Sequence, residues 1–198
     1  NAAILLSPSC HPTHRMYFRG IGTATPPARY TKAECLAAFK NSDWYARLDA
    51  RSHLIARTVL QRDNGIEARR LALDSLAEVF TIDPDTLDQR FLAHAPALAS
   101  SAVVHALEAA GLEAGAIDAV VVSTCTGYVC PGLSGYVAER IGLRADVQAF
   151  DLVGQGCAAA LPNLQLARSL IGKEVGDEAK TRTPAGERVF EILEVVFK

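Results

Sequence analysis

The sequence predicts a layered α/β fold, and two short buried strands within an alternating pattern are the evidence for it. Residues 119–124 (AVVVST) and 147–153 (VQAFDLV) are runs whose apolar and β-branched residues suit buried strands. Helical patterns precede the first run, separate the two and follow the second, so the order from residue 103 onward is helix, strand, helix, strand, helix. Such alternation is typical of strands enclosed between layers of helices.

The composition is that of a folded protein with one core, or with half the core of a larger two-part protein. The chain has 198 residues, of which 49% are hydrophobic and 21% charged, and its formal net charge is −2. This charge gives no general attraction for nucleic acid or an anionic membrane, so we expect neither as a partner. No apolar run approaches the roughly 18 to 20 residues of a membrane-spanning helix. The opening stretch lacks the basic region of a secretory signal, and we expect a cytoplasmic protein.

The first third of the chain predicts a short strand and two helices. Residues 16–21 have the mixed alternation of a short strand, and a loop rich in glycine and proline follows. Thr31 and Glu34 have the spacing of a capping box, so a helix should start there and run to about Lys40. A second helical run covers residues 54–61 and stops before the Asn-Gly pair that follows.

A long helix should follow, and it has a recognisable start and end. Asp83 suits the capping position, Pro84 suits the first helical position, and Gly111 suits the end. Apolar residues at i, i+4 and i+7 share one face of this helix: Val103, Leu107 and Ala110. Another helix is predicted over residues 133–141, again ending at a glycine.

The most informative stretch surrounds Cys157, where the second buried strand turns into a helix. Gly154 and Gly156 release the backbone for a tight turn, and an Ala/Leu-rich helical run follows. Unpaired N–H groups and the positive dipole end at a helix start favour a thiolate, so Cys157 should be easy to ionise and nucleophilic. A small buried apolar role is the alternative for such a cysteine. Pro162 should remove a hydrogen bond from this helix and kink it.

Other residues offer binding chemistry of lower specificity. Parallel strands ending at residues 124 and 153 would project their loops from one sheet edge, placing Cys125 and Thr126 in one cavity with Cys157. Arg69 and Arg70 follow an exposed turn and could pair with the phosphates of a nucleotide-like carrier such as coenzyme A. An ordinary solvated basic pair explains these two arginines equally well.

The five cysteines are odd in number and widely spread, which favours reduced thiols. Cys10, His11 and His14 form a cluster that resembles part of a metal site. A proline intervenes, however, and no second ligand pair has zinc-like spacing. We therefore expect a surface loop there, with no metal site and no cofactor.

Two motifs together, STCTGYVCPG at residues 123–132 and DLVGQGCAAALPN at 151–163, resemble the type III polyketide synthases. These are the chalcone and stilbene synthase-like branch of the thiolase superfamily. The resemblance covers residues 16–171, including the segment GIEARRLAL. It implies the N-terminal half of a homodimeric, thiolase-like αβαβα fold. Residues 1–171 would form this domain, and residues 172–198, rich in Lys, Glu, Gly and Pro, would be an unmatched tail from a truncated or rearranged second half.

The resemblance also implies an activity and roles for individual residues. Cys157 would carry a starter acyl group from acyl-CoA as a thioester, and the enolate from decarboxylation of malonyl-CoA would attack it. Cys125 and Thr126 would line the cavity, and Cys130 would reach across the dimer interface. Arg69 or Arg70 would lie near coenzyme A. The alternative for Cys130 is an ordinary buried loop residue.

Two features of the chain depart from the family pattern. The family usually has an Asp soon after the Pro-Gly pair, where this chain has Leu133 and Ser134. The family's catalytic His and Asn lie well after the cysteine, whereas here all five histidines precede Cys157, and Asn163 is the one asparagine beyond it. Because those groups stabilise the enolate, the chain alone should be acylated but should condense poorly.

Three further interpretations remain open on the sequence. A ketoacyl-ACP synthase III-like enzyme also places a cysteine at such an elbow, and carrier preference would distinguish it. A non-catalytic acyl-binding or dimerisation module would keep the fold without the catalytic His and Asn. A cysteine hydrolase is a further alternative, although no motif places a histidine as its base. Half of such a fold would also leave apolar faces uncovered, so the lone chain should be unstable or associate.

Overall fold

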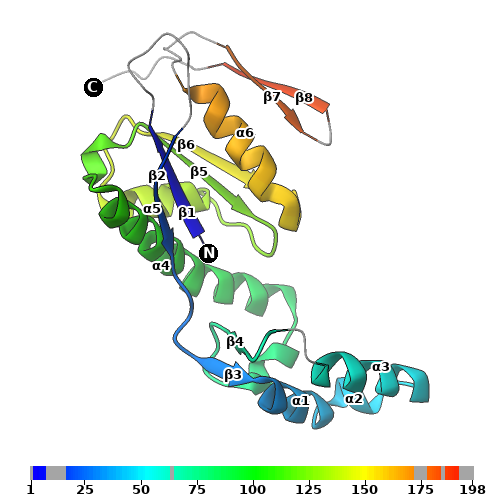
Figure 1. The fold of residues 1–198 in the computed structure, drawn as a ribbon. Coiled ribbons are helices and arrows are strands. Elements are labelled where there is room, and N and C mark those ends of the chain that lie inside the picture. Colours follow the sequence, from blue (N-terminus) through cyan, green and yellow to red (C-terminus); the bar gives the residue numbers. More distant parts are fainter. Residues whose placement is uncertain (1, 8–16, 63–64, 172–177, 184–185, 192–198) are drawn as a thin grey trace. The chain divides into compact units, whose positions relative to one another are not determined.

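A computed structural model of the chain describes residues 2–7, 17–62, 65–171, 178–183 and 186–191. The chain divides into two compact units, one made of residues 1–24 and 91–198 and the other of residues 25–90. Each unit has its own strands and helices (Figure 1).

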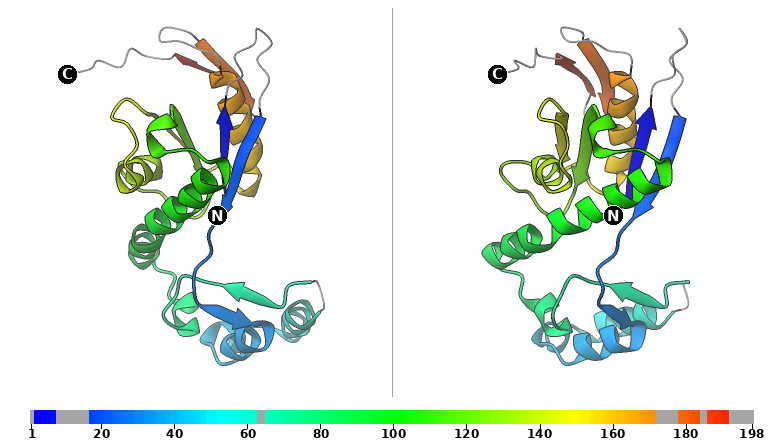
Figure 2. Two further views of the ribbon diagram at one scale, coloured as in Figure 1. Left: turned by 60° about the vertical axis from the view of Figure 1, so that its left-hand side comes forward. Right: turned by 90° about the vertical axis from the view of Figure 1, so that its left-hand side faces the viewer.

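The first unit contains the strand–helix–strand–helix segment that the sequence predicts. Strands β5 (Ala119–Thr124) and β6 (Gln148–Val153) pair in parallel, with Ala119 opposite Gln148 and Thr124 opposite Val153. Helix α5 (Leu133–Ile141) connects them, and α6 (Ala160–Leu170) follows β6. Figure 2 shows these two helices on opposite faces of the strand pair. The predicted layering of helices on both faces of the strand pair is confirmed for this segment, but the strands themselves are only partly buried.

Helix α4 (Pro84–Ala110) packs directly against strand β2 (Tyr17–Thr23). A Cβ atom added to Gly20 or Gly22 would overlap the backbone of α4, at Ala106 and Ala102 respectively. Ala102 and Ala106 are accordingly almost fully buried. The predicted apolar face of Val103, Leu107 and Ala110 is therefore only partly correct. The closest contact between α4 and β2 is made at Ala102 and Ala106 instead. Strand β1 (Ala2–Ser7) pairs with β2 in antiparallel orientation.

The apolar core of the first unit consists mostly of small and branched side chains from these helices. Among the described residues, Val137 of α5 and Leu166 of α6 are the largest side chains that are fully buried. Both belong to the helices that flank β5 and β6. Burying each of them stabilises the unit by about 1.5 to 3 kcal/mol relative to exposure to water.

The second unit follows its sequence signals closely. Strand β3 (Arg29–Thr31) pairs with β4 (Ala68–Arg70) in antiparallel orientation. The capping box is present, since the Thr31 amide donates to Glu34 Oε2 at 2.7 Å and the Glu34 amide donates to Thr31 Oγ1 at 3.2 Å. The hydrogen bonds that the Thr31 amide and hydroxyl donate to the Glu34 carboxylate hold the pKa of Glu34 below its ordinary value. The remaining helices are α1 (Lys32–Lys40), α2 (Asp43–Ala46), α3 (Ala50–Gln61) and the 3-10 helix η1 (Leu76–Phe80).

Two helix predictions need correction. Helix α3 begins at Ala50, four residues before the predicted start, because Asp49 caps it by accepting from the Ser52 amide at 2.7 Å. Pro162 does not interrupt a helix: residues Cys157–Ala159 form a 3-10 turn, η3, and α6 starts only at Ala160. Pro162 thus lies in the first turn of α6, where its missing N–H needs no partner.

The tail contains an antiparallel hairpin. Strand β7 (Glu178–Thr183) contacts α6 and pairs with β8 (Gly186–Glu191). The described part of the predicted unmatched tail is thus a strand pair. The predicted Cys10, His11 and His14 cluster lies outside the described residues.

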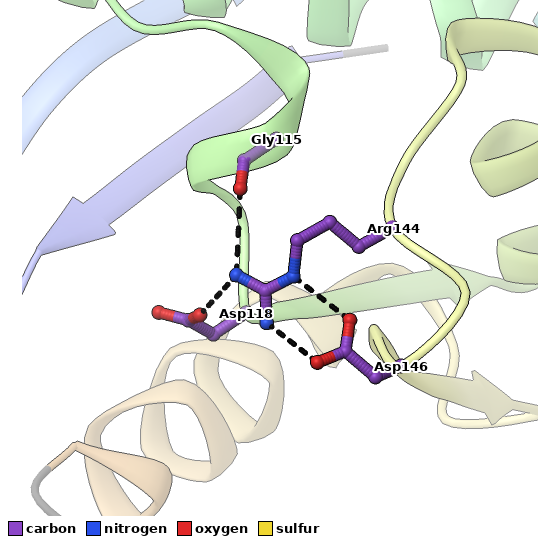
Figure 3. Close-up of polar contacts among 4 residues, drawn as sticks. All are labelled: Gly115, Asp118, Arg144 and Asp146. Carbon is purple, nitrogen blue, oxygen red and sulfur yellow. Dashed lines mark hydrogen bonds and ion pairs between the residues drawn. The ribbon is translucent and has the colours of Figure 1, made fainter. Parts of the chain in front are cut away.

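An ion network fixes the starting ends of β5 and β6 (Figure 3). Arg144, in the loop before β6, donates to both carboxylate oxygens of Asp146 at 2.8 and 3.0 Å. It also donates to Asp118 Oδ1 at 3.0 Å and to the carbonyl of Gly115 at 3.4 Å, just before β5. The hydrogen bonds from Arg144 lower the pKa of Asp146. One guanidinium therefore joins the two loops that lead into the strand pair.

Candidate active site

The candidate site lies where β6 ends and turns into a helix. Val153 is the last residue of β6, and the turn contains Gly154 with φ +75° and Gly156 with φ +69° and ψ −171°. Few residues other than glycine adopt the backbone of Gly156. Cys157 follows as the first residue of η3, and its side chain is exposed. The predicted strand-to-helix elbow is confirmed, and the alternative of a buried apolar cysteine is wrong.

Cys125 lies beside Cys157, as the parallel pairing of β5 and β6 predicts. Cys125 follows the last residue of β5, and the amide of Gly154 donates to the carbonyl of Thr124 at 3.3 Å. The strand ends are therefore joined where the two cysteines emerge. A hydrogen bond to the Cys157 side chain, together with slight burial and the charge of a Cys157 thiolate, raises the pKa of Cys125. A raised pKa keeps Cys125 protonated and able to donate its S–H toward Cys157.

The loop after Cys125 carries two further residues to which the sequence analysis assigned roles, Thr126 and Cys130. Thr126 is exposed on the same loop, which closes through a hydrogen bond from Thr124 Oγ1 to the carbonyl of Gly127 at 2.9 Å. Cys130 is exposed before Pro131, so the alternative of a buried loop residue is wrong. Its place at a dimer interface stays a prediction.

Arg69 and Arg70 belong to the other compact unit and lie on strand β4. Arg70 donates from Nη1 to the carbonyls of Pro27 at 3.1 Å and Pro26 at 3.4 Å. Arg69 is half-buried, and its Nη1 has no hydrogen-bond partner among the described residues. The pair is thus not simply two solvated cations, although coenzyme A binding stays a prediction.

Asn163 is the one asparagine after Cys157 in the sequence, and its side chain is engaged within the fold. Asn163 donates from its amide to the carbonyl of Val121 at 3.2 Å and to Ser123 Oγ at 3.3 Å, so it ties α6 to β5. The Nδ1 atom of His105 lies 2.8 Å from the carbonyl oxygen of Thr23, and His105 is distant from the elbow in the sequence. Asn163 therefore positions the elbow helix and is not available to bind a carbonyl oxygen.

Sequence reasoning missed a contact between β6 and the start of α5. Asp151 accepts hydrogen bonds from the amide of Ser134 at 3.1 Å and from its hydroxyl. Its carboxylate fills the space beside Gly132, where a Cβ atom would overlap it. This chain thus places a carboxylate at the Pro-Gly loop from a neighbouring strand, although Leu133 and Ser134 replace the expected Asp. A separation of seventeen residues left no local signal for this contact.

Cys125 and Cys157 are both exposed. Two hollows lie elsewhere on the chain, one between α1 and α3 and the other between α4 and α5. Among the described residues no three potential metal ligands gather in one place. No helix in the described part of the chain has the length and apolar character needed to cross a membrane.

Comparison with known proteins assigns the family. A family model described as "FAE1/Type III polyketide synthase-like protein" matches residues 27–180. This chain belongs to that family. Over 144 residues it is 33% identical to the 1,3,6,8-tetrahydroxynaphthalene synthase of Streptomyces peucetius subsp. caesius, a match covering 73% of this chain and 37% of the synthase. The family match favours the polyketide synthase-like interpretation over a ketoacyl-ACP synthase III-like one.

Solved structures agree on the thiolase-like fold. The C-terminal type III polyketide synthase domain of Steely1 from Dictyostelium is 26% identical with a TM-score of 0.65. That match covers 76% of this chain and 42% of the Steely1 chain. The chain spans about two fifths of the length of the type III relatives it matches.

A second, unrelated likeness is short but closer in sequence. A stretch of 33 residues is 58% identical to transcription elongation factor GreA of Hyphomonas neptunium, covering 17% of this chain and 21% of that protein. A 36-residue stretch is 56% identical to GreA of Halorhodospira halophila. The chain therefore has likenesses to two families.

Proposed function

We propose that Cys157 accepts an acyl group from an acyl-CoA starter as a thioester, the loading step of a type III polyketide synthase. The observation that carries this proposal is the exposed thiol at a glycine-bounded elbow, beside a second thiol from the neighbouring strand. Family membership supports the reaction class. Free coenzyme A thioesters are the substrates, and no metal or cofactor takes part.

The loading step exchanges one thioester for another. The Cys157 sulfur attacks the carbonyl carbon of acyl-CoA, a new C–S bond forms, and the bond to the coenzyme A sulfur breaks. Coenzyme A leaves as a thiol after taking up a proton. N–H groups in the first turn of a helix favour negative charge, which supports a nucleophilic sulfur at this position.

Chain extension by malonyl-CoA is proposed for the longer protein that the relatives represent. Decarboxylation would give an enolate that attacks the thioester carbonyl, and this step requires donors that stabilise the enolate oxygen. In this chain Asn163 is already hydrogen-bonded to β5, and no histidine follows Cys157. We expect this 198-residue chain to load an acyl group and to release little extended product.

The remaining assignments complete this proposal. Arg69 or Arg70 receives the phosphates of coenzyme A, and Cys125 and Thr126 border the acyl chain. The working protein is a cytoplasmic homodimer in which Cys130 reaches the partner subunit. The exposure of Arg70 and of Cys130 supports these roles.

Intact mass spectrometry after incubation with acyl-CoA starters of increasing length tests the loading step. We expect one acyl adduct per chain, located on Cys157 by peptide mapping and absent from Cys157→Ala. Cys35→Ala is a matched control, because Cys35 is a half-exposed free thiol on α1 in the other unit. Adducts formed equally well on Cys35, or persisting in Cys157→Ala, contradict the proposal.

A second candidate is an acyl-binding module without condensing activity, favoured by the fixed amide of Asn163. Adding malonyl-CoA to the acylated chain distinguishes the two. Release of pyrones or resorcinol-type products, abolished in Cys157→Ala, supports condensation by the chain itself. A stable adduct that never extends supports the module.

We propose, in addition, that the chain is composite and that its GreA-like stretch lies at the C-terminal end. Residues 172–198 differ in composition from the preceding helix, the family match stops at residue 180, and the described part of the tail is an antiparallel strand pair. Sequencing genomic DNA and transcript across the codons for residues 160–180 tests this. One continuous reading frame is expected, and two separate loci would contradict a composite protein.

A further inference from the structure

Two thiols from different strands meet at the same end of the β5–β6 pair. The strands run in parallel with Thr124 opposite Val153, and the Gly154 amide bonds to the Thr124 carbonyl at 3.3 Å. This backbone contact lies next to Cys125 and three residues before Cys157. The strand register therefore places both cysteines at this end of the pair. The Cys157 side chain also raises the pKa of Cys125.

Both thiols are open to small reagents in solution. Cys125 and Cys157 are exposed and free, and they lie 32 positions apart in the sequence. Gly154 and Gly156 lie between β6 and Cys157, and neither has a neighbouring atom within 4 Å of an added Cβ. A disulfide needs defined Cα and Cβ separations, and an uncrowded glycine turn lets the backbone adjust to them.

We propose that Cys125 and Cys157 form an oxidisable dithiol, a modification site that a peroxide closes to an intramolecular disulfide. The Cys157 sulfur attacks one peroxide oxygen, the O–O bond breaks, and a sulfenic acid and one water result. The Cys125 sulfur then attacks the Cys157 sulfur, the S–O bond breaks, and a second water leaves. The two sulfurs lose two electrons in total, and the peroxide gains them.

The disulfide removes Cys157 from acyl transfer and protects it at the same time. A sulfenic acid without a neighbouring thiol proceeds to sulfinic acid, which is irreversible in most proteins. Cys125 captures the sulfenic acid first, and an external dithiol restores both thiols by exchange. The dithiol itself does not depend on the proposed acyl transfer, although its effect on loading does.

The test treats the reduced full chain with hydrogen peroxide in the absence of any acyl-CoA. We expect the intact mass to fall by two hydrogen atoms, a non-reducing peptide map to link Cys125 with Cys157, and dithiothreitol to reverse both changes. Addition of two or three oxygen atoms to Cys157 without a crosslink overturns the proposal. A disulfide that joins either cysteine to Cys35 or Cys130 overturns it equally.

Two variants make the result specific. Cys125→Ser should lose the crosslink completely and accumulate sulfinic acid at Cys157, whereas Cys130→Ser, which removes another exposed thiol of the same loop, should keep the crosslink. Circular dichroism of both variants verifies folding, and Cys125→Ala replaces Cys125→Ser if the latter unfolds. If the reduced chain does not load acyl-CoA, the proposed function is contradicted. The peroxide-induced Cys125–Cys157 crosslink would still stand as a separate result.

Discussion

The two ends of the β5–β6 strand pair are built from different chemistry. At the starting end, Arg144 bonds to Asp146, Asp118 and the carbonyl of Gly115, so charge holds the loops in place. At the other end, a turn with two positive-φ glycines leads to Cys157, which is exposed beside Cys125. The difference suggests that one end anchors the strands while the other keeps its side chains available for chemistry.

The largest loss of stability and of Cys157 reactivity should come from Gly156→Ala, which changes the turn at the end of the strand pair that carries Cys157. With φ +69° and ψ −171°, the backbone of Gly156 is in a region that costs other residues about 1 to 3 kcal/mol. The turn should rearrange and displace Cys157, so the rate of Cys157 alkylation by iodoacetamide should fall together with stability in urea.

Gly142→Ala is the matched control for this change. Gly142 ends α5 with φ +68° and ψ 45°, and an added Cβ there would also meet open space. Stability should fall by about 1 kcal/mol, while the alkylation rate of Cys157 should not change. Equal losses of Cys157 reactivity in both variants would show that the elbow has no special geometry.

Asn163→Ala should have the next largest effect, because it releases α6 from β5. The variant loses hydrogen bonds to Val121 and Ser123, each worth about 1 kcal/mol in net stability. The Cys125–Cys157 contact should loosen, and peroxide should then form less disulfide. Ser169→Ala removes a hydrogen bond within the same helix and should leave the disulfide yield unchanged.

A smaller effect concerns the pH dependence of Cys125. The hydrogen bond to Cys157 raises the pKa of Cys125 above its ordinary value of 9.0, so alkylation of Cys125 should reach half its maximal rate above that pH. In Cys157→Ala the raising interaction is absent, and the midpoint should move to lower pH. A profile measured by peptide mapping that stays at the wild-type midpoint would contradict the contact between the thiols.

The smallest effect should follow Arg144→Met at the charged end. Its side chain is 40% exposed, so solvent screening leaves only a modest loss of stability. Asp146 has a lowered folded-state pKa, so its stabilisation is present above the ordinary value of 3.8 and disappears as the pH falls through the lower folded value. The wild-type and variant urea curves should therefore converge in acid, and the reactivity of Cys157 should be unaffected throughout.

The elements that the sequence predicted correctly are those with local signals. The capping box at Thr31, the glycine that ends α5 and the glycines around Cys157 act through backbone conformation within a few residues. The parallel pairing of β5 and β6 also followed, because short apolar strands joined by a helix have few alternative arrangements.

The parts that sequence reasoning missed depend on contacts between distant residues. Asp151 reaches Ser134 across seventeen positions, and Asn163 reaches Val121 across forty-two. Neither pair has a periodic pattern or a conformational preference that marks it in advance. The interaction between Cys125 and Cys157 also joins distant residues. The sequence predicted that both lie at one sheet edge, but it did not predict that Cys157 raises the pKa of Cys125.

The small size of the sheets has a consequence for the protein in a cell. Strand β5 pairs with β6 along one edge, and the described residues place no strand on its other edge. Its sequence AVVVST combines high β-propensity with no charge and no proline, and all six residues are only partly buried. An open edge of this kind can template pairing with other chains and start aggregation. We therefore expect the unpaired edge of β5 to lower the solubility of the expressed protein before it affects turnover.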